Sequence, residues 1–278
     1  MVVERAIKKL IPVALKQPVR AYVDARNWRT QPRLPFAGSH LRPVSEISLP
    51  AIMNDPAISA AFAEDHARIS EVYGAGEISG GVNPGDRRAL YHLVAHFKPQ
   101  SILEIGTHVG ASTIYLASAS QRFGGSLTTA DIVDVNGPSG AWRTLGMPAP
   151  PRDFIERLGL SANFITRPAA EMLRGPRRYD LIFLDGDHSA RAVYREISAA
   201  LGPLNPGGLI LLHDFYPDCK PLTPDGAMID GPAVAAARIE GESGDLGFLP
   251  LGDLPWQTKG GGNATSLALV AATDHRTR

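Results

Sequence analysis

The chain contains one cysteine, Cys219, among its 278 residues. A single cysteine excludes a disulfide framework within the chain, so we expect a reducing compartment and a cytoplasmic protein. The sequence also lacks any run of 18 uncharged apolar residues, so no transmembrane segment is expected. No secretory signal is evident, because Lys8 and Lys9 lie inside the first apolar stretch.

Net charge is absent as well, because 28 Lys and Arg residues balance 28 Asp and Glu residues. We therefore expect no nucleic-acid partner. The charge is unevenly spread, since residues 1–40 hold eight basic and two acidic residues, a net charge of +6. Such a leader either covers an acidic body as an amphipathic segment or makes a weak contact with a membrane surface. The apolar content of 44% is that of a soluble globular protein.

From residue 101 onward, short apolar segments alternate with helical patterns. This rhythm predicts right-handed crossovers and a Rossmann-like, open, mostly parallel seven-stranded sheet with helices on both faces. The strands are expected at 101–106, 126–133, 163–166, 181–185, 208–214, 247–251 and 266–272, and the helices between them at 110–120, 151–159, 168–174 and 189–202.

The segment before this rhythm differs in character. Residues 1–30 have helical patterns in pieces, 31–50 are rich in proline, and helices are expected at 51–73 and 86–97. We therefore predict an N-terminal helical extension, residues 1–78, that covers the acceptor site or forms a contact in a homo-oligomer. Residues 79–278 would form the catalytic domain.

A glycine turn follows the first expected strand, in "LEIGTHVGAST". Gly106 and Gly110 allow the backbone to turn tightly and to approach a ligand closely. Glu104, just before the turn, would repel a pyrophosphate and suits a cationic ligand. Asp131 ends the next strand, where an acid can accept hydrogen bonds from a ribose diol. A ribonucleoside that carries positive charge and no phosphate fits this pattern, and S-adenosyl-L-methionine is such a molecule.

The segment "ILEIGTHVGAST" resembles the first motif of class I S-adenosylmethionine-dependent methyltransferases. "FLDGDHS" with "LNPGGLILLHDF" resembles small-molecule O-methyltransferases, a subgroup that includes macrolide-sugar methyltransferases, and the resemblance covers roughly residues 80–215. It implies that the methionine end of the cofactor is bound by Glu104, Gly106, Thr107, Gly110 and Ser112. It also implies that Asp131 binds the ribose, and that Ala170 and Glu171 bind the adenine.

Methyl transfer to a hydroxyl requires removal of the hydroxyl proton, by a base or with the help of a metal. Asp185 ends the fourth expected strand, and His213 and Asp214 end the fifth. Adjacent strands lie about 4.8 Å apart, so these three side chains can converge on one divalent metal. Two carboxylates suit Mg²⁺, whereas an imidazole ligand suits Zn²⁺, Mn²⁺ or Fe²⁺ better. The resembling macrolide-sugar enzymes bind Mg²⁺ through acidic residues at these positions, and we expect Mg²⁺ although His213 replaces one acid.

His188 follows Asp185 by three residues. An imidazole titrates near neutral pH and can accept a hydroxyl proton, so we assign His188 and Asp185 to catalysis. The other interpretation of His188 is a second-sphere hydrogen bond. The acceptor is expected to be a small-molecule hydroxyl, of a sugar or glycoside, bound by the proline-rich loop 215–232 with Phe215 and Tyr216.

Three alternatives stay open from the sequence. The enzyme could work without a metal, with His188 as the sole base. It could be an NAD(P)-dependent oxidoreductase, although Glu104 beside the single-glycine turn disfavours a dinucleotide. It could also be a non-catalytic, membrane-associated binding module that uses the basic leader.

Overall fold

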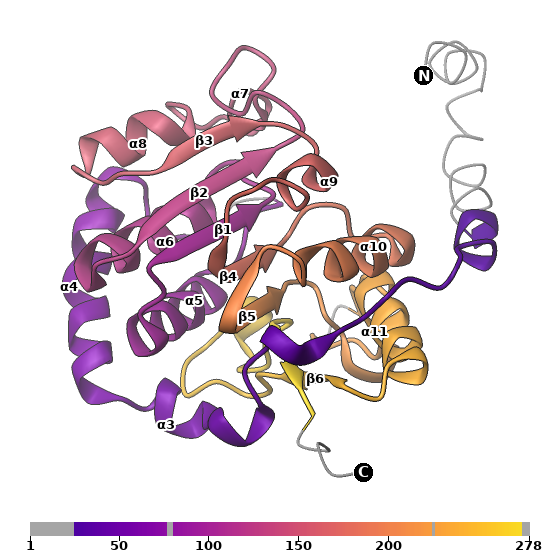
Figure 1. Cartoon of the computed structure of the whole chain (residues 1–278). Helices are drawn as coiled ribbons and strands as arrows, with labels where there is room; N and C mark the ends of the chain where they lie inside the picture. The colour runs from indigo at the N-terminus through magenta and orange to yellow at the C-terminus, as the bar shows by residue number, and fades with distance from the viewer. Residues whose placement is uncertain (1–24, 77–79, 224–225, 274–278) are drawn as a thin grey trace.

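The computed structural model describes residues 25–76, 80–223 and 226–273 (Figure 1). The expectations for residues 1–24, which carry most of the basic leader, lie outside the described residues. In the part that is described, no helix is both long enough and apolar enough to cross a membrane.

The sheet has seven strands in the order β3-β2-β1-β4-β5-β7-β6 (Figure 1). Strands β1 to β5 run parallel, whereas β7 runs antiparallel to both β5 and β6. The predicted Rossmann-like, mostly parallel seven-stranded sheet is thereby confirmed. The strands are β1 (Ser101–Ile105), β2 (Ser126–Asp131), β3 (Asn163–Thr166), β4 (Tyr179–Leu184), β5 (Leu204–Leu212), β6 (Leu246–Pro250) and β7 (Ala268–Ala272).

Helices cover both faces of the sheet (Figure 1). One face carries α3 (Leu49–Met53), α4 (Pro56–Val72), α5 (Pro84–Phe97), α6 (Ala111–Phe123) and α8 (Pro151–Arg157). The other carries α9 (Ala169–Met172), α10 (Ala190–Ala200) and α11 (Gly231–Glu242). Short elements in the connections are α7 (Ala141–Thr144) and the 3-10 turns η1 (Gly38–His40), η2 (Val44–Glu46), η3 (Pro217–Cys219) and η4 (Lys259–Gly261).

Each central strand supplies side chains to two hydrophobic clusters. In β4, Leu181 and Phe183 belong to the cluster under α4, α5 and α6, whereas Ile182 and Leu184 belong to the cluster under α10 and α11. Successive residues of a strand point to opposite faces, so a strand covered on both sides must be apolar throughout. This explains the unbroken apolar run in β4, and it directs the chemistry to the strand ends.

The structure differs from the predicted helices at several places. The helix expected at 51–73 is divided into α3 and α4, because the Asp55 carboxylate caps a new helix by accepting from the backbone N–H groups of Ala57 and Ile58. Helix α5 begins at Pro84 rather than Asp86, since Asn83 is its N-cap and proline suits the first helical position. Helix α11, unforeseen, follows the proline-rich loop.

The described part of the N-terminal extension contributes to the same core as the sheet and its helices. Ile52, Phe62 and Ile69 pack in one cluster with residues of α5 and α6. Farther upstream, the Trp28 ring lies 5.5 Å from the Tyr194 ring of α10, and the Arg238 guanidinium of α11 lies over Trp28. The division at residues 78 and 79 and the contact in a homo-oligomer stay predictions.

Candidate active site

A cavity of about 1330 Å³ opens at the carboxyl ends of the parallel strands. Ligands of open α/β sheets bind at this edge, where the strand order reverses on either side of β1. Residues after β1, β2, β3, β4 and β5 line the cavity, and the segment 80–83 and the loop 222–229 add to its walls. None of the described residues 25–76 lines it, and the cover for the acceptor that we predicted from the extension stays a prediction.

The turn after β1 lies directly against the end of β4. Gly106 has a φ of +100°, and a Cβ at this position would lie 2.1 Å from the Asp185 carbonyl oxygen. Only glycine accommodates both the positive φ and this close approach. The Asp185 N–H also donates to the Ile105 carbonyl, at 2.9 Å. The glycine turn therefore sets the position of Asp185 beside the cavity.

Glu104 lies beneath the turn and is fully buried. It points to the α6 face of the sheet, because its neighbours Leu103 and Ile105 occupy the opposite face. Its carboxylate accepts hydrogen bonds from the hydroxyl groups of Ser112, Thr113 and Thr129, at 2.5, 2.6 and 2.6 Å. Burial raises the pKa of the Glu104 carboxyl to about 7, against the effect of these hydroxyl groups.

Asp131 ends β2 at the cavity wall. One carboxylate oxygen accepts the backbone N–H of His108, at 3.0 Å, and the other accepts that of Val133, at 3.1 Å. These bonds hold the carboxylate in place between the glycine turn and the segment after β2. A carboxylate has about four acceptor positions, so two are left for the hydroxyl groups of a ribose.

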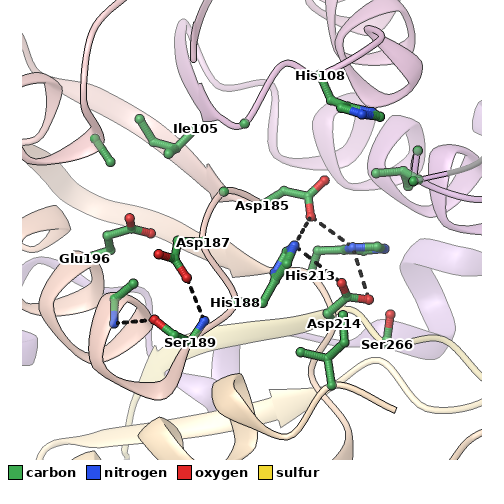
Figure 2. Close-up of a pocket in the computed structure, with 18 of the residues that line it drawn as sticks. Ile105, His108, Asp185, Asp187, His188, Ser189, Glu196, His213, Asp214 and Ser266 are labelled. Carbon is green, nitrogen blue, oxygen red and sulfur yellow. Dashed lines mark hydrogen bonds and ion pairs between the residues drawn. The ribbon is translucent and has the colours of Figure 1, made fainter. Parts of the chain in front are cut away.

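Two carboxylates and two imidazoles meet where β4 and β5 end (Figure 2). Nδ1 of His213 lies 3.0 Å from Oδ1 of Asp185 and 3.5 Å from Oδ1 of Asp214. Nε2 of His188 lies 3.5 Å from Oδ2 of Asp214 and 3.9 Å from Oδ1 of Asp185. Asp214 has a φ of +54°, a left-handed conformation that aspartate tolerates better than most residues.

His213 is held from behind by a buried carboxylate. Its Nε2 lies 3.3 Å from Oδ2 of Asp86, which is fully buried in the first turn of α5. Asp86 also accepts hydrogen bonds from the Thr265 hydroxyl and the Asn83 amide. Burial lowers the pKa of His213, but Asp185, Asp86 and Asp214 outweigh burial and raise it well above its ordinary value. His213 thus forms ion pairs with the acids in front of it and behind it.

His188 is the more accessible of the two imidazoles, with 30% of its side chain exposed against 11% for His213. The start of α11 fixes its backbone, since a Cβ at Gly231 would lie 1.9 Å from the His188 carbonyl oxygen. Ser189 then caps α10 by accepting from the Ala192 N–H. The imidazole is therefore presented at the cavity by two packed helices.

Residues 103–215 match the family model described as "Methyltransferase domain". This part of the chain is therefore similar to a methyltransferase domain. The matched segment runs from β1 to the residue after Asp214, so it contains the glycine turn and both strand ends with their acids. The predicted resemblance to class I S-adenosylmethionine-dependent methyltransferases is confirmed.

Solved structures of methyltransferases share the fold. An O-methyltransferase from Bacillus cereus in complex with SAH is 21% identical, with a TM-score of 0.50, and the comparison covers 82% of this chain and 94% of that one. The O-methyltransferase TomG from Streptomyces achromogenes, involved in tomaymycin synthesis and solved with SAM, is 21% identical, with a TM-score of 0.49 and coverage of 79% and 91%. Because the sequence identity is only 21%, the likeness to the Bacillus cereus enzyme supports the fold alone.

The cavity is lined by only part of the residues that the sequence pointed to. Those at its surface are Gly106, Asp131, Ala170, Asp185, His188, His213 and Asp214. Those outside its lining are Glu104, Thr107, Gly110, Ser112 and Glu171. Thr107 is buried with its hydroxyl 2.6 Å from that of Thr129, so it supports the turn from below together with Glu104 and Ser112.

Sequence reasoning missed several residues of the site. Asp86 looked like the start of a helix and carried no sign of its contact with His213, which is 127 residues away. Glu196 lies inside an amphipathic helix, where an acid is ordinarily on the solvent side. A signal was present for three exposed apolar residues of the cavity wall, because each lies in or beside a segment already assigned to a ligand. They are Ile132, Met228 and Ile229.

Proposed function

We propose that this methyltransferase transfers the methyl group of S-adenosylmethionine to a hydroxyl group of a small molecule. The observation that carries the proposal is the grouping of Asp185, His188 and Asp214 on the wall of the cavity that also contains Gly106 and Asp131. In the reaction, the S–CH₃ bond breaks and its electron pair stays on sulfur, while an O–CH₃ bond forms. The hydroxyl proton must leave as this bond forms.

His188 is the base in this proposal. Its Nε2 faces Asp214, which can hold the ring and balance the charge that develops on it. Because Asp214 accepts the Nε2–H, the other ring nitrogen, Nδ1, is the one that takes the proton of a hydroxyl group, and the partial exposure of the ring makes it accessible. General-base catalysis contributes about 10²–10⁴-fold in rate, which is the loss expected when this imidazole is removed.

The donor set fits a divalent cation. Each of Asp185, His188 and Asp214 offers one ligand atom, and these atoms lie within 4.8 Å of one another. We propose that Asp185 and Asp214 hold Mg²⁺, which prefers carboxylate oxygens and keeps several other ligands. Such an ion would lower the pKa of the acceptor hydroxyl. The ion pairs of His213 with Asp86 and Asp185 favour a supporting role for the imidazole that we predicted as a ligand.

A metal-independent mechanism is the second candidate. The contact between His188 and Asp214, 3.5 Å, is the observation that favours it, because an acid and an imidazole form a working base without an ion. The two candidates share the cofactor and the base, and they differ in whether the carboxylates must bind a cation.

The acceptor is proposed to be a sugar or a glycoside. The cavity is larger than the range of about 300–1,000 Å³ that is usual for one small ligand, so an acceptor fits beside the cofactor. The loop 215–232, which we assign to acceptor binding, contributes Tyr216, Met228 and Ile229 to the cavity wall. Lys259 adds one positively charged side chain. Phe215 does not line the cavity, because its ring stacks on Phe248 inside the core.

Calorimetry and a methyl-transfer assay together test the proposal. The wild-type chain should bind S-adenosylhomocysteine, and it should transfer labelled methyl groups to some member of a panel of sugars, glycosides and phenols. The variant His188→Ala should lower kcat about 10²–10⁴-fold while cofactor affinity changes little. Absence of cofactor binding by folded protein would refute the whole proposal. Full activity after removal of divalent ions would select the metal-independent mechanism.

A further inference from the structure

One titratable group on the cavity wall has no part in the chemistry above. Glu196 lies in the second turn of α10, on the helix face that also presents Ser189 and Ala192 to the cavity. Figure 2 shows its carboxyl group on the same side of the site as Asp187 and Ile105, apart from the group formed by Asp185 and Asp214.

Among the described residues, the Glu196 carboxyl group forms no hydrogen bond or ion pair, although Glu242 elsewhere on this face of the sheet does form both. Burial, together with the nearby Asp187 carboxylate, raises the pKa of Glu196 to about 8. The other charged groups at this end of the cavity are Arg167 after β3 and Asp131 after β2. A protonated carboxyl group offers one O–H donor and one carbonyl acceptor, side by side.

The strand order decides which part of the cofactor can reach this carboxyl group. The reacting methyl must lie near Asp185 at the end of β4, and we assign the ribose to Asp131 at the end of β2. The adenine ring of the cofactor then extends past Asp131, between the segment after β3 and α10. The walls there are apolar: Ile132, 74% exposed, and Pro168, Ala169, Ala170 and Ala192. A slot with these apolar walls and a carboxyl group at its end is suited to a purine ring.

We propose that Glu196 recognises adenine, accepting a hydrogen bond from the 6-amino group and donating one to the ring nitrogen N1. This assigns a specificity residue to the cofactor site, and it rests on the proposed function in that the ligand is S-adenosylmethionine or its product. The proposal explains why a carboxyl group with no hydrogen-bond partner among the described residues lies beside these apolar side chains. Once the ligand covers it, a polar group of this kind disfavours a ligand that leaves it unpaired.

The test is calorimetry of S-adenosylhomocysteine with the wild type and with Glu196→Ala, Glu196→Gln and Glu71→Ala. Glu196→Ala should weaken binding roughly ten- to hundredfold, because the adenine edge is left without partners. Glu196→Gln should bind within about threefold of the wild type, since an amide also has one donor and one acceptor to offer. Glu71 is exposed on α4, outside the cavity lining, and its removal should have no effect.

Two further measurements separate recognition from a structural role. An analogue of S-adenosylhomocysteine that lacks the 6-amino group should bind to the wild type about tenfold more weakly than the parent compound does. To Glu196→Ala the analogue and the parent compound should bind with equal affinity. Wild-type affinity should also fall about tenfold between pH 7 and pH 9 relative to Glu196→Gln, because the donor proton is lost.

The outcomes are distinct. If the wild type binds the product cofactor, and Glu196→Ala has an unchanged Kd and still prefers the parent to the analogue, the inference about Glu196 is wrong and the proposed function stands. If folded wild type binds neither ligand, the proposed function itself fails. Should Glu196→Ala unfold, the comparison of the two ligands and the pH series on wild type and Glu196→Gln still decide the question.

Discussion

Replacing Glu104 with glutamine should make the protein more stable at neutral pH and leave its stability at acidic pH nearly unchanged. Glu104 is fully buried near the end of β1, and among the described residues its hydrogen-bond partners are three hydroxyl groups that can each reorient to donate or accept. Glutamine has the same shape and no charge. The substitution therefore removes the cost of a buried charge without creating a cavity.

The magnitude follows from the pKa. Burial raises the pKa of Glu104 from 4.5 to about 7, so the folded protein holds this proton more tightly than the unfolded chain does. The associated stability is complete below pH 4.5 and is lost as the pH rises to about 7. At about 1.36 kcal/mol for each pKa unit, the loss amounts to about 3 kcal/mol. The free energy of unfolding of Glu104→Gln, minus that of the wild type, should rise by this amount.

Urea unfolding followed by circular dichroism at pH 5, 6, 7 and 8 measures this difference. Glu71→Gln, on the exposed surface of α4, controls for the loss of a carboxylate that is in contact with solvent. The reasoning is refuted if the wild-type and Glu104→Gln values run parallel over this range, or if the wild type gains stability relative to the variant as the pH rises.

The same variant tests whether Glu104 attracts the cofactor, as the sequence suggested. S-adenosylmethionine carries a sulfonium charge that S-adenosylhomocysteine lacks. Since the Glu104 side chain lies beneath the turn, we expect Glu104→Gln to change the two affinities by the same factor. A selective loss of the sulfonium ligand would instead show that the buried carboxylate acts on it.

The remaining predictions concern the acids of the site. Asp185→Asn and Asp214→Asn should each abolish Mn²⁺ binding in a calorimetric titration and lower turnover at least a hundredfold, with cofactor affinity nearly intact; a variant that keeps wild-type turnover in metal-free buffer contradicts the metal site. Asp86→Ala should lower the free energy of unfolding by about 1–3 kcal/mol, because His213 and Thr265 lose a buried partner. If the variant and the wild type are equally stable in urea, the contact does not stabilise the fold. Asp131→Ala should weaken S-adenosylhomocysteine binding by about 1–3 kcal/mol in calorimetry, and an unchanged affinity would remove Asp131 from the ribose site.

The fold could be predicted from the sequence because its signals are local. Apolar runs such as that of β4 and the helical spacing of α10 each recur within about ten residues. A parallel sheet then brings all strand ends to one edge, so the convergence of Asp185 with His213 and Asp214 followed from the order of elements alone. Helix boundaries were less certain, since Asp55 and Asn83 compete with their neighbours for the capping position.

Only the tertiary structure decided which way each polar side chain faces and what it meets. Glu104 and Asp185 both end apolar strands, yet one is turned into the core by strand alternation and the other reaches the cavity. The contact of Asp86 with His213 joins residues 127 positions apart, and the place of Glu196 on the cavity wall depends on the packing of α10 against the sheet. Many acidic residues have the same local sequence pattern, and packing decides which of them meet a given partner. The sequence alone therefore predicted the kind of chemistry, and the three-dimensional arrangement decided which residues are placed to perform it.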